Sequence, residues 1–381
     1  MIVETSSSER IASPLQCRLC GHPHRPVPLQ AGERAHCAQC GGLLAKGPRF
    51  GPRGALSFTI AGAILALPAV GLPFVTVDRL QSERVGYLFT GVEMLWSEGM
   101  RVLALAVLLC GILAPLLLLT LLGLLHIPRR RFWSERGRRT LLRVAETMEH
   151  WAMPEVHVLA VLVALTKLGT LVNVHVGPGF WCYGAMTLCL IAAWRNTALA
   201  PDDLPPIRHS RRHSARRCAA LALAATVMLI PANALPILNT ATRGIERTDT
   251  IFSGIVKLWG DGLFVIAAIV FAASILIPLL KLVGLAWLLL AARPGGSPRR
   301  VGLTRLYSVL EFVGRWSMLD VFLVAFLAGL VQFGGLSSIQ PRIGIVAFAA
   351  AVVLTVLATD AFDPRLLWQR APRKSQPDSS S

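Results

Sequence analysis

Residues 101–125 read RVLALAVLLCGILAPLLLLTLLGLL, an apolar run whose only charge is its first residue. A helix of about 20 such residues spans the hydrocarbon core of a bilayer, so we expect a transmembrane helix here. Seven more stretches have similar length and character. The eight predicted spans cover approximately residues 55–77, 101–125, 153–174, 178–198, 218–238, 263–291, 317–333 and 343–360. The sequence therefore predicts an all-α polytopic membrane protein.

The composition agrees with this class. Of the 381 residues, 54% are hydrophobic and only 15% are charged, whereas a soluble domain carries about 25% charged residues. This excludes ordinary soluble enzymes and disordered chains. The net charge is +17, and we expect the excess cations in cytoplasmic loops. No nucleic-acid partner is expected, because no basic domain with interleaved aromatic residues accompanies these charges.

The distribution of positive charge predicts the orientation of the helices. With the N-terminus inside, the inner segments hold 27 Lys and Arg residues and the outer loops hold 6. An excess of Lys and Arg marks the cytoplasmic side. We therefore place both termini in the cytoplasm.

An internal repeat relates the two halves of the chain. PAVGLP at 68–73 recurs as PANALP at 231–236, and GVEMLWSEG at 91–99 recurs as GIVKLWGDG at 254–262, both with an offset of 163. Further on, WAMPE at 151–155 matches WSMLD at 316–320. Each copy contains four predicted spans, an even number, so both copies enter the membrane in the same direction. We expect two parallel four-helix transmembrane repeats.

Each repeat also carries a basic inner segment, at 136–152 and 301–316, with apolar residues at helical intervals. Such a pattern favours a helix that lies in the membrane interface with its arginines toward water. A solvated linker is the alternative.

The N-terminal region contains two Cys-x2-Cys pairs, Cys17 with Cys20 and Cys37 with Cys40. Their sixteen-residue separation is typical of a structural zinc site, in which four thiolates bind Zn²⁺ tetrahedrally. Two disulfides or a redox dithiol are the alternatives, and a reducing cytosol disfavours both. We therefore predict a small cytoplasmic zinc ribbon.

These features divide the chain into six predicted parts. They are a disordered N-terminus (1–14), the zinc ribbon (15–50), the first repeat (55–200), a basic linker (201–217), the second repeat (218–368) and a disordered tail (369–381).

The second repeat has ionisable residues within its predicted spans, which are costly there and therefore indicate function. Lys281 follows Pro278, which would kink the helix and free a carbonyl. At 1.5 Å per residue, Asp320 and Thr355 fall in the same half of the bilayer as Lys281. We expect these three side chains to form a polar network. Snorkelling of Lys281 to the interface is the alternative.

The first repeat lacks this combination. Its equivalents of Lys281, Asp320 and Thr355 are Leu118, Glu155 and Leu190. Lys167 is the cation within its spans, and Glu155 lies too far along the helix axis to pair with it. The second repeat is therefore expected to perform the function, with Glu155 and Lys167 in supporting roles.

Four motifs of the second repeat identify a resemblance: PANALP (231–236), PLLK (278–281), WSMLD (316–320) and FDPR (362–365). Together with the zinc ribbon and the duplicated units, they resemble the paraquat-inducible protein A family from about residue 15 to 368. This resemblance implies an inner-membrane protein of Gram-negative bacteria with tetraspanin-like four-helix units. It also implies a periplasmic MCE-domain tunnel protein as partner and phospholipids as cargo. Within the family pattern, Lys281, Asp320 and Thr355 look like a polar network thought to matter for transport.

The expected function is thus lipid transport between inner and outer membranes, not catalysis. The network could change protonation and couple movement to a proton gradient, or it could simply hold the helices in register. Two other functions stay open: a non-transporting scaffold or regulator, and a membrane thiol oxidoreductase that uses Cys182 and Cys189.

Overall fold

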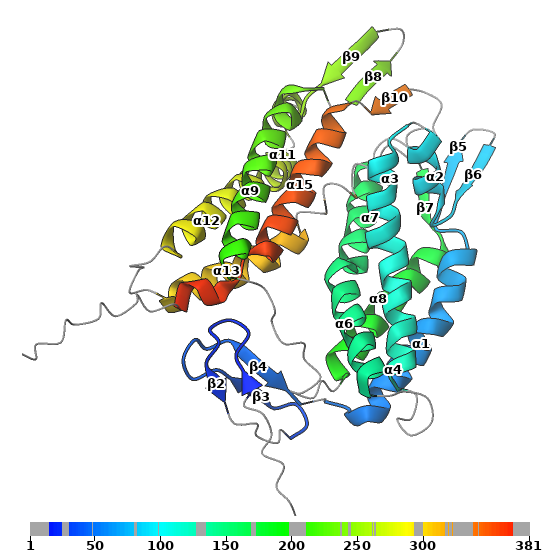
Figure 1. Cartoon of the computed structure of the whole chain (residues 1–381). Coiled ribbons are helices and arrows are strands. Elements are labelled where there is room, and N and C mark those ends of the chain that lie inside the picture. Colours follow the sequence, from blue (N-terminus) through cyan, green and yellow to red (C-terminus); the bar gives the residue numbers. More distant parts are fainter. Residues whose placement is uncertain are drawn as a thin grey trace, which may run out of the picture.

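The computed structural model places three parts of the chain: a small N-terminal ribbon and two helical units (Figure 1). The residues that it describes are 15–24, 30–47, 49–79, 82–97, 99–126, 135–168, 173–197, 211–236, 238–242, 245–260, 262, 264–292, 300–316, 319, 322, 338–341 and 343–368. The predicted disordered ends, 1–14 and 369–381, lie outside this part of the chain, as do residues 201–210 of the predicted linker and all of the seventh span except 319 and 322. The rest of the predicted linker, 211–217, is helical and forms the start of α9 (Arg211–Ala234).

The ribbon consists of two short antiparallel pairs of strands. Strand β1 (Leu15–Gln16) pairs with β2 (Pro23–His24), and β3 (Arg34–His36) pairs with β4 (Leu43–Lys46). Each Cys-x2-Cys pair occupies the turn of one hairpin, followed by Gly21 or Gly41 at φ +76° and +74°. Because glycine lacks a Cβ, it adopts this left-handed conformation without strain. The two turns can therefore bring four cysteines together.

The first unit contains a long antiparallel pair of helices and a small sheet. Helix α1 (Gly51–Gly71) packs along α8 (Pro178–Asn196). Helix α4 (Ala114–His126) packs on both α1 and α6 (Glu135–Trp151). Strands β5 (Val75–Arg79), β6 (Ser82–Gly86) and β7 (Asn173–Val176) form an antiparallel sheet in the order β6-β5-β7. The other helices are α2 (Thr90–Ser97), α3 (Arg101–Val107), the π-helical turn η1 (Leu108–Leu113), α4 (Ala114–His126), α6 (Glu135–Trp151) and α7 (Pro154–Leu168).

The second unit repeats this arrangement. Helix α9 (Arg211–Ala234) packs along α15 (Ile343–Ala361), and β8 (Leu238–Thr242), β9 (Ile245–Asp249) and β10 (Ser338–Pro341) form a sheet in the order β10-β8-β9. Its remaining helices are α10 (Ile251–Gly260), α11 (Phe264–Phe271), the π-helical turn η3 (Ala272–Leu276), α12 (Ile277–Ala291), α13 (Arg300–Trp316) and the 3₁₀ turn η4 (Pro364–Trp368).

The boundaries of matching elements keep the offsets of the sequence repeat. Strands β5 and β6 begin at Val75 and Ser82, and β8 and β9 begin 163 residues later, at Leu238 and Ile245. Helices α6 and α13 begin at Glu135 and Arg300, which are 165 residues apart. Since even the strand ends coincide, the two halves of the sequence fold in the same way.

The structure corrects the all-α prediction in two places. The β-hairpins begin at the ends of the predicted first and fifth spans, at Val75 and Leu238, and continue into the segments that follow. β-Branched residues such as Val75, Thr76 and Val77 favour this extended backbone. The predicted second and sixth spans are each interrupted by a π-helical turn, η1 and η3. The chain is therefore mostly helical with small terminal sheets.

Four helices in the part of the chain that the structure describes are long and apolar enough to cross a bilayer. They are Arg53–Gly71, Arg101–His126, His213–Ala234 and Ser274–Ala291, and a shorter apolar helix covers Val346–Ala361. Among the other predicted spans, α7 has only 15 residues and α8 carries Arg195 near its end.

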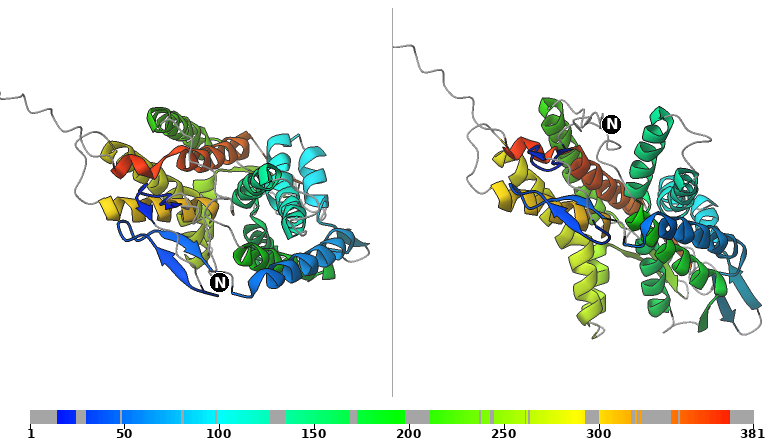
Figure 2. Two further views of the ribbon diagram at one scale, coloured as in Figure 1. Left: turned by 60° about the horizontal axis from the view of Figure 1, so that its bottom comes forward. Right: turned by 90° about the horizontal axis from the view of Figure 1, so that it is seen from below.

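Ribbon and sheets lie at opposite ends of the helical units (Figure 1). We call these the ribbon end and the sheet end. Seen from below, the ribbon lies against the second unit and reaches the boundary with the first (Figure 2). The two units also touch each other: the rings of His157 on α7 and Phe322 are 5.3 Å apart, and His150 Nε2 of α6 lies 2.7 Å from Asp360 Oδ2 of α15.

Candidate functional site

Lys281 is buried inside the second unit, with only 1% of its surface exposed. It lies on α12, whose sequence IPLLKLVGLAWLLLA is otherwise apolar. Its Nζ donates a hydrogen bond of 3.0 Å to Thr355 Oγ1 on α15. The structure therefore brings together two of the three predicted network residues, 74 positions apart, and excludes snorkelling of Lys281 to the surface.

Thr355 is held in place by its own helix. Its hydroxyl group donates a hydrogen bond of 2.7 Å to the carbonyl of Val352. The lone pairs of the same oxygen are then available to accept the hydrogen bond from Lys281. A buried polar group costs free energy unless it is hydrogen-bonded, so the lysine and the threonine each satisfy the other in an apolar environment. Asp320, the third predicted member, lies outside the described residues.

Two further residues shape the surroundings of the amine. Gly314 of α13 lies beside it, since a Cβ added there would sit 3.7 Å from Lys281 Nζ. Pro278, the predicted kink, is buried at the second position of α12, directly after η3. A π-helical turn is a common feature of functional sites, and here it sets the start of the helix that carries the lysine.

The corresponding place in the first unit is different. Leu118 and Leu190 are buried there, with 2% and 3% exposure, and Glu155 is half-buried at the start of α7. The backbone of Lys167 lies in α7, but its side chain is outside the described residues. The amine–hydroxyl pair of Lys281 and Thr355 is therefore a feature of the second unit.

The four ribbon cysteines gather as the sequence predicted. Their sulfur atoms all lie within 4.8 Å of one another, with Cys17 and Cys40 at 3.6 Å and Cys20 and Cys37 at 3.5 Å. All four are free thiols. Each of these two contacts links a cysteine of the first Cys-x2-Cys pair with a cysteine of the second. The arrangement is compatible with a metal site, because a tetrahedral metal with 2.3 Å bonds to sulfur separates its ligands by about 3.8 Å.

The electrostatics of this cluster favour one thiolate first. Burial opposes the ionisation of Cys37, but backbone hydrogen bonds at Cys40 and Gln39 and the contact with His24 outweigh it and lower its pKa to about 6. Burial raises the pKa of Cys40 to about 11. His24 Nε2 lies 3.2 Å from Cys37 Sγ. His24 belongs to neither Cys-x2-Cys pair, so the cysteine spacing carries no signal for this contact.

Comparison with known proteins identifies the family. The sequence matches the family description "Paraquat-inducible protein A" over residues 53–199 and 215–372. The chain belongs to this family. The two matched segments coincide with the two helical units. Together with the long apolar helices of this chain, the family match indicates a multi-pass membrane protein.

Three similar proteins carry transport names. "Intermembrane transport protein PqiA" of Escherichia coli (strain K12) is 32% identical over 92% of this chain and 94% of its own length. "Lipophilic envelope-spanning tunnel protein A" of the same strain is 28% identical over 89% of this chain and 87% of its own. "Probable intermembrane transport protein" of Haemophilus influenzae is 26% identical over 96% and 97%. No solved structure matches the chain.

Proposed function

We propose that this chain is the inner-membrane subunit of an MCE-type intermembrane lipid transport system. It would pass phospholipid between the bilayer and a periplasmic tunnel formed by an MCE-domain protein. The observation that carries the proposal is the match over nearly the whole chain to proteins named for intermembrane transport. The buried amine–hydroxyl pair in an apolar helical unit supplies an element that transport can use.

The proposed membrane topology has eight spans, with both termini in the cytoplasm and two parallel four-helix repeats at 55–200 and 218–368. Two observations support it. The repeat is retained in the element boundaries. The basic helices α6 and α13 lie with the ribbon (15–50) at one end, where a cytoplasmic side is expected to be positive. The sheet end, with its exposed Trp96 and Trp259, would then face the periplasmic partner.

The proposed working centre is the network of Lys281, Thr355 and Asp320, positioned by Pro278. A lysine in an apolar bundle can gain or lose a proton at moderate cost only when polar partners are at hand. The contact of 3.0 Å with Thr355 provides one such partner. A change of protonation would alter the packing of α12 against α15 and so couple proton movement to lipid movement. Glu155 and Lys167 would support the first unit.

The ribbon would bind one structural Zn²⁺ through Cys17, Cys20, Cys37 and Cys40. Four thiolates form one of the common structural zinc sites, and the four sulfur atoms lie within 4.8 Å of one another. The metal would fix the two hairpins against each other. We propose no catalytic role for it, and none for the chain as a whole.

The helical geometry argues against the thiol oxidoreductase. Cys182 and Cys189 both lie on α8, seven residues apart, so about 10.5 Å separates them along the axis. A disulfide needs Cα atoms within about 7 Å. These two thiols therefore cannot form an intrahelical disulfide pair.

The test is complementation of a membrane-barrier defect in a strain that lacks the gene. Lys281→Ala and Asp320→Asn should abolish complementation while protein levels stay normal. Lys374→Ala, in the C-terminal tail sequence, is the matched control and should complement fully. Full activity of both network variants would remove the network from the mechanism. Transfer of a fluorescent phospholipid from vesicles containing the chain to the purified MCE protein separates transport from scaffolding: a scaffold gives none.

A further inference from the structure

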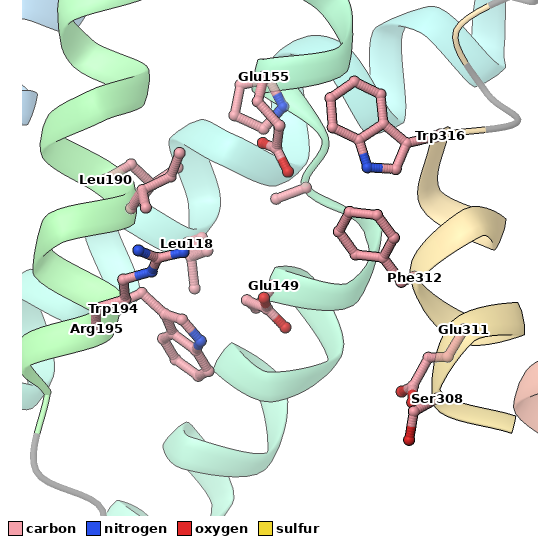
Figure 3. Close-up of a pocket in the computed structure, with 13 residues that line it drawn as sticks. Leu118, Glu149, Glu155, Leu190, Trp194, Arg195, Ser308, Glu311, Phe312 and Trp316 are labelled. Carbon is pink, nitrogen blue, oxygen red and sulfur yellow. The ribbon is translucent and has the colours of Figure 1, made fainter. Parts of the chain in front are cut away.

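A cavity of about 470 Å³ lies at the boundary between the two units, toward the ribbon end. The first unit provides most of its wall through α4, α6, α7 and α8, and α13 of the second unit closes the other side (Figure 3). Figure 3 shows Glu149 and Glu155 extending into the space between α8 and α13, with Phe312 and Trp316 opposite Leu190. Both units are thus needed to form it.

The cavity occupies the place in the first unit that corresponds to the lysine site of the second. Its lining includes Leu118, Glu155 and Leu190, the three equivalents of Lys281, Asp320 and Thr355. In the second unit this place is occupied by a buried amine. In the first, two leucines and a carboxylate border open space instead. The duplication has therefore left a position where an external amine could take the place that Lys281 holds in the second unit.

The charges that border the cavity favour an ammonium group beside a phosphate. Glu149, Glu155 and Glu311 contribute three carboxylates, and Arg195 contributes one guanidinium. Carboxylates form strong charge-assisted hydrogen bonds with the N–H groups of a primary ammonium, and arginine binds phosphate in the same way. The faces of Trp194 and Trp316 add cation–π attraction.

The location of the cavity favours an amphiphile over a soluble amine. Helix α13 is amphipathic, with Phe312 and Trp316 exposed on it, and aromatic residues of this kind gather at the membrane interface. The opposite helix α6 is amphipathic too. Between them, Leu118, Leu190 and Ile191 continue the wall into the apolar part of the bundle. A ligand here meets both charged groups and apolar side chains.

We propose that this cavity binds the headgroup of a phospholipid with a primary amine, of the phosphatidylethanolamine type. The ammonium lies among the carboxylates, the phosphate lies at Arg195, and the first carbons of the acyl chains follow the leucines. The volume suits a headgroup and its nearest carbons but not a whole phospholipid. This inference rests on the proposed function and specifies the class of lipid that enters from the cytoplasmic leaflet.

The test is lipid binding to the purified full-length chain in detergent, measured by native mass spectrometry without the MCE protein. The probes are dioleoyl phosphatidylethanolamine, phosphatidylcholine and phosphatidylglycerol. We expect the ethanolamine lipid to bind about tenfold more tightly than the glycerol lipid, because a charge-assisted hydrogen bond changes affinity by roughly that factor. The choline lipid should bind less tightly than the ethanolamine lipid, since its quaternary ammonium has no N–H donor.

Variants then locate the binding site. The double substitution Glu149→Gln/Glu155→Gln should abolish the preference for ethanolamine, and Ser308→Trp, at an exposed position on the rim, should block the cavity. Glu93→Gln, an exposed carboxylate of α2, is the matched control and should bind like the wild type. Equal affinity of the wild type for all three lipids would overturn the proposal, as would a preference that survives Ser308→Trp.

The outcome is independent of the transport assay. A wild-type chain that transfers lipid but binds all three lipids equally would refute the cavity assignment alone. Selective ethanolamine binding in a chain that transfers no lipid would refute the proposed function and leave the cavity assignment in place.

Discussion

Arg365, just after the last long helix, donates hydrogen bonds of 3.3 Å from its guanidinium to the backbone carbonyls of Cys17 and Arg18. These residues are separated by more than 340 positions in the sequence. The side chain of Arg18 itself forms an ion pair of 2.8 Å with Glu146 of α6. The ribbon is therefore attached to the second unit through Arg365 and to the first unit through Arg18. It connects the two helical units at the end that we propose to be cytoplasmic.

Arg365→Ala should loosen the ribbon from the second unit without unfolding it. Two charge-assisted hydrogen bonds would be lost, each worth about 1.5–3 kcal/mol when fully formed, and less here because Arg365 is partly exposed. Hydrogen–deuterium exchange should accelerate at residues 15–24. Arg216→Ala, an exposed arginine of α9, is the control. Unchanged exchange in the Arg365 variant would show that the remaining contacts, among them Trp368 packing and the Arg18–Glu146 ion pair, hold the ribbon in place.

Removal of the metal should loosen the ribbon from the helical units more than Arg365→Ala does. The ribbon is too small to bury a core of its own, and ligand binding supplies the folding free energy of such sites. Elemental analysis should find one zinc per chain, and Cys37→Ser should lose it. Limited proteolysis should then cleave within residues 15–46 while the helical units stay intact. Cys182→Ser is the control, and zinc retained by the Cys37 variant would contradict the assignment of the ligands.

The sequence predicted those features of the fold that follow from local pattern. Apolar length, the constant offset of the repeat and the Cys-x2-Cys spacing led to the helices, the duplication and the cysteine cluster. The strands β5 and β8 were missed, because a short stretch at the end of a span looks like the last residues of the span and the first of a loop until its partner strand is known. The π-helical turns η1 and η3 were missed because their sequences are as apolar and helix-forming as their neighbours.

In the site, too, the features that follow from local sequence pattern could be predicted, and those that depend on distant segments could not. A lysine and a threonine within apolar spans stand out by their cost, so Lys281 and Thr355 could be paired by their depth alone. Gly314, His24 and Arg365 could not, because their roles depend on contacts between segments far apart in the sequence. The cavity at Glu155 likewise depends on how α13 approaches the first unit, which no local pattern records.

The double substitution Lys281→Leu/Thr355→Leu should separate folding from function. It gives the second unit the leucines that the first unit already has at Leu118 and Leu190. Replacing a buried polar pair by apolar residues is often neutral or stabilising, so the thermal midpoint should stay equal or rise. Complementation should nevertheless be lost.

The single substitution Thr355→Val is the informative comparison. It leaves the amine of Lys281 without its hydroxyl partner and should destabilise the chain by about 1–3 kcal/mol. A double variant that complements fully would show that the pair is a structural filler. A double variant that fails to fold would show that the leucines do not fit, and Lys281→Met would then replace it.

Tyr183→Phe should destabilise the first unit through the π-helical turn η1. The buried hydroxyl of Tyr183 donates to the carbonyl of Gly111 within η1, and the corresponding position in the second unit is Phe348, 165 residues later. Removing the hydroxyl leaves a buried carbonyl without this donor, which costs about 1–3 kcal/mol. A lower thermal midpoint of the purified chain would show this cost. Tyr87→Phe, an exposed tyrosine near the sheet end, is the matched control and should leave the midpoint unchanged. Equal midpoints for both variants would mean that the Tyr183 hydroxyl does not stabilise η1.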